Sequence, residues 1–213
     1  VSMAERWLQA RGMTMTRGPI DGAPTDECGV LIAGHDRRPA IWEAHTPPYY
    51  QRLLERQGFT KYDDVFAYEF ALSRLERDGD LLPPLVHRIA ARLHTSTSVS
   101  VRSVNDRTWE ADVAIAHMLY NTAFRTIPGH TDMSFANFRA LAQSLRPFLD
   151  RDLMLLAEVD GRPAGFAVAL PDLNEALAML NGEESLWNLI KLHWYRRRIR
   201  TICFKLLGVL PEY

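Results

Sequence analysis

The chain has few residues of the kinds that mark secreted, metal-binding or membrane-spanning proteins. Its two cysteines, Cys28 and Cys203, lie far apart in 213 residues, and neither belongs to a CxxC pair. We therefore expect two buried thiols, no disulfide and no bound metal. No apolar run approaches the roughly 20 residues that a membrane span requires, and no basic stretch followed by an apolar one opens the sequence. These absences predict a cytoplasmic protein without a membrane partner.

An excess of charge of either sign is also missing. Lysine and arginine number 25 against 26 aspartate and glutamate residues, a net charge of −1. A near-neutral chain has no general affinity for nucleic acid or for anionic membranes. A basic run at residues 196–200 (RRRIR) follows a predicted helix, and cations are favourable at a helix C-terminus. We interpret this run as helix-end stabilisation rather than as a phosphate or nucleic-acid patch.

Periodic patterns of apolar residues predict an α+β (mixed α/β) protein. Alternation favours strands over residues 13–20, 65–70, 99–104, 153–159, 163–170 and 200–209. Helical spacing favours helices over residues 4–11, 49–57, 109–124, 134–145, 175–180 and 184–196, with one more between 73 and 98. The dipeptide Asp160-Gly161 is typical of a two-residue hairpin turn. We predict a mostly antiparallel sheet flanked by helices.

Three segments carry a resemblance to a known family. Residues 155–166 (LLAEVDGRPAGF) form the hairpin, residues 209–213 (VLPEY) end the last strand, and residues 49–59 (YYQRLLERQGF) form a helix ending in Gly-Phe. Their order and spacing resemble the GNAT acyltransferase superfamily, most closely its long bacterial members with two such units. Further features shared with that group are residues 17–19, 26–29, 170–177 and 181–182.

The resemblance implies two incomplete units in series. Residues 1–72 resemble the C-terminal half of a first GNAT-like domain, residues 73–98 a linker with one helix, and residues 99–213 the N-terminal half of a second domain. Both ends look cut beside the place of the family's pyrophosphate loop. Open sheet edges would then favour self-association or poor solubility of the chain alone.

The resemblance also implies a reaction, in which an acyl group, usually acetyl, passes from a coenzyme A thioester to an amine. Acetyl-CoA would be the cofactor, and a small-molecule or other amine acceptor the partner. The family's glycine-rich loop, Q/R-x-x-G-x-G/A, is absent from the sequence. We therefore expect N-acyltransferase activity in the parent protein and none in this chain by itself. The alternative is a non-catalytic structural or interaction module of the same fold.

Three residues of the last strand are the cofactor-binding candidates. In the resembled family, the positions of Leu207, Gly208 and Val209 offer backbone groups to the pantetheine arm. The alternative is that they form plain core strand. Gly208 inside a strand also indicates a bulge or a close approach of the backbone.

Two residues are the catalytic candidates. Leu54 holds the place of the family's general-acid tyrosine, and Tyr50, one turn earlier on the same helix face, is the candidate substitute. Glu158, in the strand beside the expected site, is the candidate general base. A packed aromatic side chain and a solvated carboxylate at a sheet edge are the respective alternatives.

Overall fold

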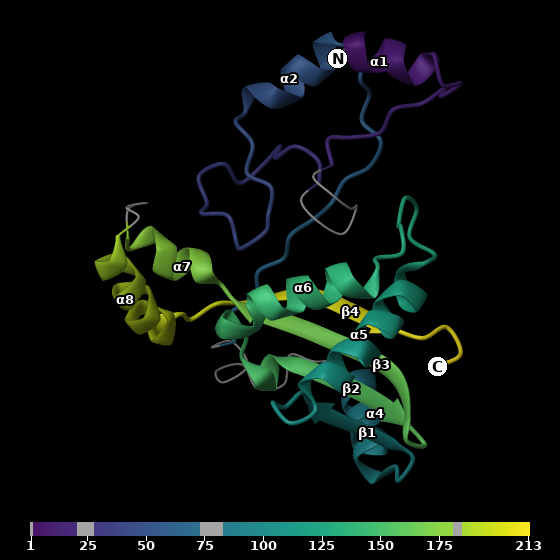
Figure 1. Cartoon of the computed structure of the whole chain (residues 1–213), viewed down its shortest axis with the longest axis vertical. Helices are drawn as coiled ribbons and strands as arrows, with labels where there is room; N and C mark the ends of the chain where they lie inside the picture. The colour runs from purple at the N-terminus through teal and green to yellow at the C-terminus, as the bar shows by residue number, and fades with distance from the viewer. Residues whose placement is uncertain (1, 21–27, 73–82, 181–184) are drawn as a thin grey trace.

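The computed structural model describes residues 2–20, 28–72, 83–180 and 185–213. Four strands form one antiparallel sheet, and each strand pairs with its neighbour along the chain (Figure 1). The strands are β1 (Val99–Ser103), β2 (Met154–Val159), β3 (Arg162–Pro171) and β4 (Ile202–Val209). The α-helices are α1 (Ser2–Gln9), α2 (Tyr49–Arg56), α4 (Pro84–Thr95), α5 (Trp109–Phe124), α6 (Phe135–Leu145), α7 (Leu173–Ala178) and α8 (Leu186–Tyr195). The α+β class and the antiparallel sheet are as predicted.

A tight turn joins β2 to β3. Asp160 and Gly161 both have positive φ, at 49° and 72°, which is the backbone geometry of the turn expected for an Asp-Gly hairpin. The turn sets the register in which Leu156 lies opposite Phe166. Both of these side chains therefore point to the same face of the sheet.

The hydrophobic core lies between this face of the sheet and α5. The helix α5 contacts β3 and β4, and α6 packs against α5 and adds Phe138 and Ala142 to the rim of the core. The buried members of the core come from both layers: Val104, Trp109, Val113, Leu119, Tyr120, Leu156, Phe166 and Leu210. Burial of this cluster on one face is what positions β4 and the loop that follows β3.

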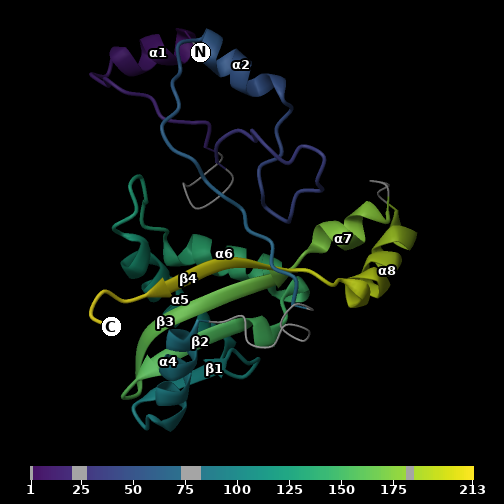
Figure 2. The same cartoon turned by 180° about the vertical axis from the view of Figure 1, so that it is seen from behind.

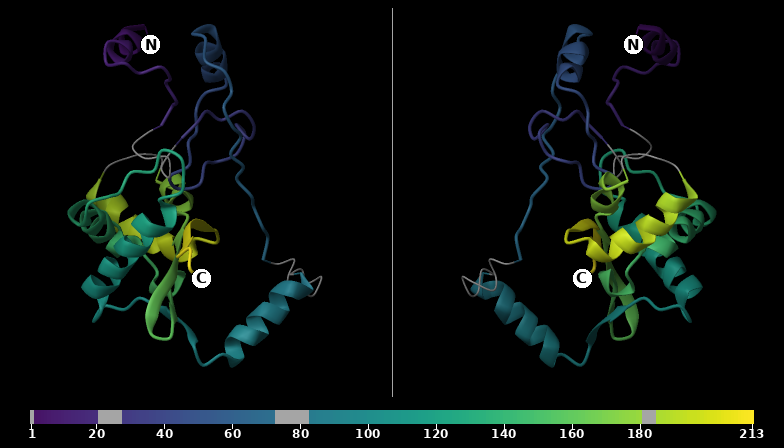
Figure 3. Two further views of the ribbon diagram at one scale, coloured as in Figure 1. Left: turned by 90° about the vertical axis from the view of Figure 1, so that its right-hand side faces the viewer. Right: turned by 90° about the vertical axis from the view of Figure 1, so that its left-hand side faces the viewer.

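The opposite face of the sheet is uncovered among the described residues. Leu207 and Val209 of β4 point to it and remain 61% and 52% exposed. The helix α4 leads into β1 through a short connection, but Figure 3 shows it standing apart from the sheet. In the part of the chain that is described, the sheet and the helices on one of its faces thus form two layers.

The segment before α4 has little regular structure besides α1 and α2. The strands predicted over residues 13–20 and 65–70 are wrong, because neither stretch has a neighbouring strand with which to form a ladder. Alternation favours an extended backbone, but a strand needs a hydrogen-bonded partner. Val65 and Tyr68 are accordingly 85% and 90% exposed. The proposed division at residues 73–98 stays a prediction.

Candidate functional site

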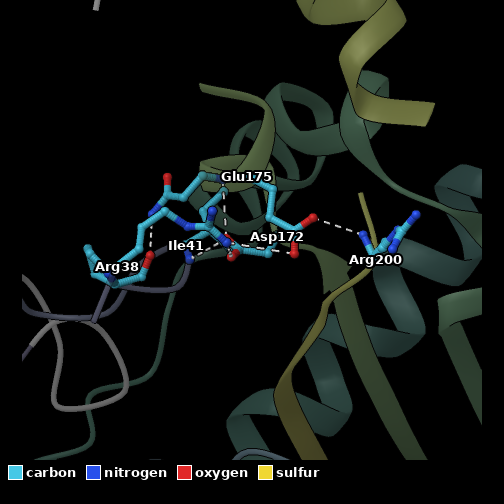
Figure 4. Close-up of polar contacts among 7 residues, drawn as sticks. Arg38, Ile41, Asp172, Glu175 and Arg200 are labelled. Atoms are coloured by element: carbon cyan, nitrogen blue, oxygen red, sulfur yellow. Dashed lines mark hydrogen bonds and ion pairs between the residues drawn. The ribbon is translucent and has the colours of Figure 1, made fainter. Parts of the chain in front are cut away.

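A buried carboxylate joins the N-terminal segment to the end of the sheet. Asp172 follows β3, caps α7 and is only 3% exposed. Its Oδ1 accepts hydrogen bonds from the backbone N–H of Ile41, at 3.0 Å, and of Asn174, at 3.2 Å, while Arg38 Nη2 lies 3.2 Å from Oδ2 (Figure 4). Because Ile41 and Arg38 lie over 130 residues from Asp172 in sequence, this carboxylate fixes two distant parts of the chain together.

We call the contacts that hold Arg38 and Ile41 to Asp172 the junction. A second carboxylate, Glu175, adds to it. Glu175 lies 3.7 Å from Arg38 and accepts a hydrogen bond from the backbone N–H of Arg200 at 2.9 Å. Burial tends to raise the pKa of Glu175, but hydrogen bonds from Thr201 and Arg200 and the charge of Arg38 outweigh it, so the pKa lies below its usual value. Glu175 is therefore ionised at neutral pH, as its ion pair requires.

The start of β4 completes the junction. Lys205 Nζ lies 2.6 Å from Glu43 Oε1, so a third contact holds the N-terminal loop against the sheet. Cys203 is buried beside Asp172, and burial together with that negative charge raises the pKa of its thiol. Its thiol is thus protonated at neutral pH and a poor nucleophile. The expected burial is confirmed for Cys203, whereas Cys28 is only half-buried.

An apolar hollow of about 500 Å³ opens beside α2 in the N-terminal segment. Its lining is Pro19, Ile20, Gly29, Ala44, Thr46, Tyr50, Leu53 and Leu54. Backbone contacts hold the walls together: Gly29 N–H donates to the Pro19 carbonyl at 2.9 Å, and Leu31 N–H donates to Thr46 Oγ1 at 2.9 Å. Few polar groups face this hollow, so it suits a hydrocarbon group better than a charged one.

Tyr50 belongs to this hollow and not to the sheet. Its ring makes an edge-to-face contact with Tyr49 at 5.1 Å between centroids. In Figures 1 and 3, α2 lies far from β2, which carries Glu158. The structure therefore does not bring the two catalytic candidates together, and the role of each stays a prediction.

Glu158 takes part in a charge network at the sheet edge. Arg102 bridges two carboxylates, with Nε 3.1 Å from Glu158 and Nη2 2.8 Å from Asp112. Asp112 is buried in α5 and also accepts a hydrogen bond from Thr108 at 2.7 Å. Burial tends to raise the pKa of Asp112, but the hydrogen bonds from Arg102 and Thr108 outweigh it and hold the pKa below its usual value. Glu158 is thus an ion-pair partner in this structure.

The three cofactor-binding candidates lie on two faces of β4. Leu207 and Val209 point to the uncovered face, whereas Gly208 points toward α5. A Cβ at Gly208 would lie 2.5 Å from Phe166 Cε1 and 3.0 Å from Ala123 Cβ. A close backbone approach or a bulge was expected at Gly208; the atoms that approach it most closely belong to core side chains. Whether these three residues meet a cofactor stays a prediction.

Two curated proteins are similar to this chain. One is the bacterial ceramide synthase of Caulobacter vibrioides (strain NA1000 / CB15N), 32% identical over 212 residues, which are 99% of this chain and 53% of that protein. The other is protein YghO of Escherichia coli (strain K12), 27% identical over 212 residues, again 99% of this chain and 53% of that protein. The chain spans about half the length of these curated relatives. No family model matches it.

These relatives overturn the GNAT resemblance. They are named ceramide synthase and YghO, and no GNAT model matches, so the predicted tandem GNAT family and N-acetyltransferase function are wrong. The relatives do not support the non-catalytic alternative either. The resemblance rested on element order, an Asp-Gly hairpin and a Gly-Phe helix end, which recur in many α+β proteins because they follow from local chain geometry.

The residues of the junction were missed as a group. Asp172, Asn174 and Glu175 fall within residues 170–177, which the sequence singles out without a role. An aspartate before a helix is a cap signal, so the local part of this arrangement could have been predicted. Arg38 lies in a loop rich in glycine and proline, where no pattern indicates its partner. The part of the site that was missed is the long-range part.

Proposed function

We propose that this chain is part of a protein that makes ceramide, by joining a long acyl chain to the amino group of a long-chain amino alcohol. The observation that carries the proposal is the 32% identity to a bacterial ceramide synthase across 99% of the chain. The aligned region spans nearly the whole chain and is not confined to one local motif. The activity belongs to the longer protein of which the relatives are examples.

The proposed reaction needs an activated acyl donor. The amine nitrogen attacks the acyl carbonyl carbon of a thioester, the C–N bond forms and the C–S bond breaks. The nitrogen releases a proton, and the departing thiolate takes one up. A ceramide carries a long acyl chain, so a long-chain acyl thioester replaces the expected acetyl-CoA as donor. Coenzyme A as the carrier of that acyl group stays a prediction.

The apolar hollow supports a lipid substrate. The hollow is open to solvent, since Ile20, Tyr50 and Leu53 are 37%, 40% and 49% exposed, and its lining is largely aliphatic. Desolvation of a hydrocarbon chain against such a lining is favourable, at roughly 25 cal/mol per Å² of buried apolar area. Tyr50 adds a phenol group at this apolar surface. We propose that one hydrocarbon chain of the substrates lies here.

The junction supports a role for the hollow together with the sheet. Arg38 and Ile41 are held by Asp172, and Ala44 and Thr46 of the hollow follow a few residues later. If residues 38–46 moved away from the sheet, one wall of the hollow would therefore move with them. We propose that the junction positions the bound chain relative to the sheet, as catalysis by proximity requires.

The test is acyl transfer by the purified full-length protein. It is incubated with a sphingoid base and, in separate reactions, with acetyl, octanoyl and palmitoyl thioesters of coenzyme A, and N-acyl products are measured by mass spectrometry. We expect an N-acyl sphingoid base from the palmitoyl donor and little from the acetyl donor. An Ala44→Phe variant, which narrows the hollow, should raise KM for the palmitoyl donor more than for the octanoyl donor. Transfer of acetyl in preference to palmitoyl would refute the proposal.

A further inference from the structure

Large apolar side chains line one side of α8 and face solvent. Trp187, Ile190 and Trp194 are 69%, 61% and 53% exposed. Their spacing of three and then four residues places them on one face of the helix. Exposed apolar groups also occur elsewhere in this structure, for example on β4 and at residues 65–70, so exposure alone does not distinguish this stripe. What distinguishes it is the charge beside it.

Basic side chains surround this apolar stripe. The segment from residue 185 to 200 has five exposed cations and no acidic residue: Lys191, Arg196, Arg197, Arg198 and Arg200. The rest of the chain holds the other 20 basic residues and all 26 acidic ones. None of the five cations forms an ion pair within the described part of the chain. Residues 185–200 thus carry a local excess of positive charge on a chain whose net charge is −1.

Two of the cations adjoin the stripe, and the other three follow α8 directly in the sequence. The guanidinium carbon of Arg198 lies 3.8 Å from the ring centroid of Trp194, a cation–π contact that keeps the two together. Lys191 follows Trp187 by four residues and lies on the same side of α8. We call this surface, made of Trp187, Ile190, Lys191, Trp194 and residues 196–200, the α8 surface.

The α8 surface is supported from behind. Arg196 Nη1 donates to the Pro147 carbonyl at 2.7 Å, which ties the end of α8 to the segment after α6. At the other end, Ser185 caps the helix by accepting from the Asn188 N–H at 3.2 Å. Figures 1 and 2 show α8 beside α7 at one end of the molecule, away from the sheet. The stripe is therefore presented outward on a helix that is held in place.

We propose that the α8 surface docks peripherally on a bilayer that contains anionic lipids, which departs from the expectation of no membrane partner and gives residues 196–200 a role beyond helix-end stabilisation. Tryptophan side chains partition into the interfacial layer of a membrane, where the indole ring is buried and its N–H stays near water. Arginine and lysine beside them meet the lipid phosphates. Nucleic acid would match the cations but not the exposed Ile190. A protein groove would match the stripe but not this excess of cations, none of which has an ion-pair partner among the described residues. A bilayer surface matches both.

This contact is peripheral. No helix among the described residues is long and apolar enough to cross a bilayer. The inference stands apart from the proposed function, since it rests on the α8 surface alone, although the proposed substrates are membrane lipids. A protein that acts on such lipids gains access to them when it lies on the bilayer.

The test is binding of the full-length protein to vesicles. Flotation is measured with vesicles of phosphatidylcholine alone and of phosphatidylcholine mixed equally with phosphatidylglycerol, and brominated acyl chains report burial of tryptophan by quenching. We expect binding to the anionic vesicles and weak binding to the neutral ones. An Arg197→Gln/Arg198→Gln variant should bind about 25-fold more weakly, at about fivefold for each charge near the surface. A Trp187→Ser/Trp194→Ser variant should lose about tenfold in binding and most of the quenching.

Matched controls use surfaces outside α8. Arg52→Gln/Arg56→Gln removes the same charge from α2 and should change binding less than twofold. Trp7→Ser removes an indole of similar exposure and should leave the quenching largely intact. Circular dichroism checks that each variant is folded, and the arginine and tryptophan pairs test the surface independently of each other.

The results that would overturn the inference are also specific. Equal binding by wild type and both α8 variants would do so, and so would the absence of binding to anionic vesicles. Binding of single-stranded RNA that depends on Arg197 and Arg198, without vesicle binding, would assign the surface to nucleic acid instead. The assay contains neither sphingoid base nor acyl donor. If the full-length protein binds anionic vesicles but forms no ceramide in the separate acyl-transfer assay, that result counts against the proposed function only.

Discussion

Substitution of Gly208 by alanine should destabilise the sheet by overpacking the core. The added Cβ would lie 2.5 Å from Phe166 Cε1 and 3.0 Å from Ala123 Cβ, closer than carbon atoms pack. The ring of Phe166 is buried and contacts Phe124 edge-to-face at 6.0 Å between centroids, so it has little room to withdraw. Either the ring or β4 must shift, because neither neighbour is the mobile end of a flexible side chain.

The magnitude follows from two opposing terms. Overpacking of a well-packed core costs about 1–3 kcal/mol. Replacement of glycine by alanine restricts the unfolded chain and returns about 0.4–1 kcal/mol. We expect Gly208→Ala to lower the free energy of unfolding by about 1–2 kcal/mol. With a urea m-value of about 2 kcal/mol/M, the unfolding midpoint falls by about 0.5–1 M.

The assay is urea unfolding followed by tryptophan fluorescence, combined with a double-mutant cycle. Phe166→Leu removes the ring that the new Cβ meets, so Gly208→Ala should be less damaging in that background by about 1 kcal/mol. Leu207→Ala, the neighbouring exposed position, serves as the control and should change stability little. An unchanged midpoint in Gly208→Ala, or additive effects of the two substitutions, would refute the packing role of Gly208.

Three further predictions concern the junction, the charge network and the hollow. Asp172→Ala leaves the Ile41 N–H without its acceptor and should destabilise the protein by about 2–3 kcal/mol. The same substitution removes a negative charge that helps burial to raise the pKa of Cys203, so alkylation of Cys203 by iodoacetamide should become faster. The lowered pKa of Asp112 means that its stabilisation is complete at neutral pH and is lost as the pH falls from about 4 through its folded-state pKa. In acid unfolding curves, the free energy of unfolding of Asp112→Asn should therefore fall less below about pH 4 than that of the wild type. A variant with the same pH dependence as the wild type would contradict this role of Asp112. If Tyr50 donates a proton in the reaction, Tyr50→Phe should lower kcat about a hundredfold or more and Tyr49→Phe should not, as steady-state kinetics of the full-length protein would measure.

Local signals in the sequence predict local structure well in this chain. The hairpin between β2 and β3 forms where Asp160 and Gly161 accept positive φ. Serine at position 134 caps α6 by accepting from the Asn137 N–H at 3.3 Å, and the expected helix follows. Gly208 marks a close approach because a glycine is unfavourable in a strand without such a reason. Each of these features depends on a few consecutive residues.

Features that depend on distant partners could not be predicted in the same way. Residues 65–70 alternate like a strand, but no neighbouring strand pairs with them in the described structure. The contact between Arg38 and Asp172 joins residues 134 positions apart, and neither residue's neighbours in sequence indicate it. Element order alone led to the wrong family, since the same order of strands and helices serves many functions.

The most direct test of the proposed function is the appearance of ceramide in a host that makes none. The full-length protein is expressed in such a host, the cells are supplied with a sphingoid base labelled with ¹⁵N, and lipid extracts are analysed by mass spectrometry. We predict an N-acyl product that carries the label and a long acyl chain, present with the protein and absent with the empty vector. Recovery of the labelled base without any N-acyl product, in cells where the protein is folded and abundant, would contradict the proposal.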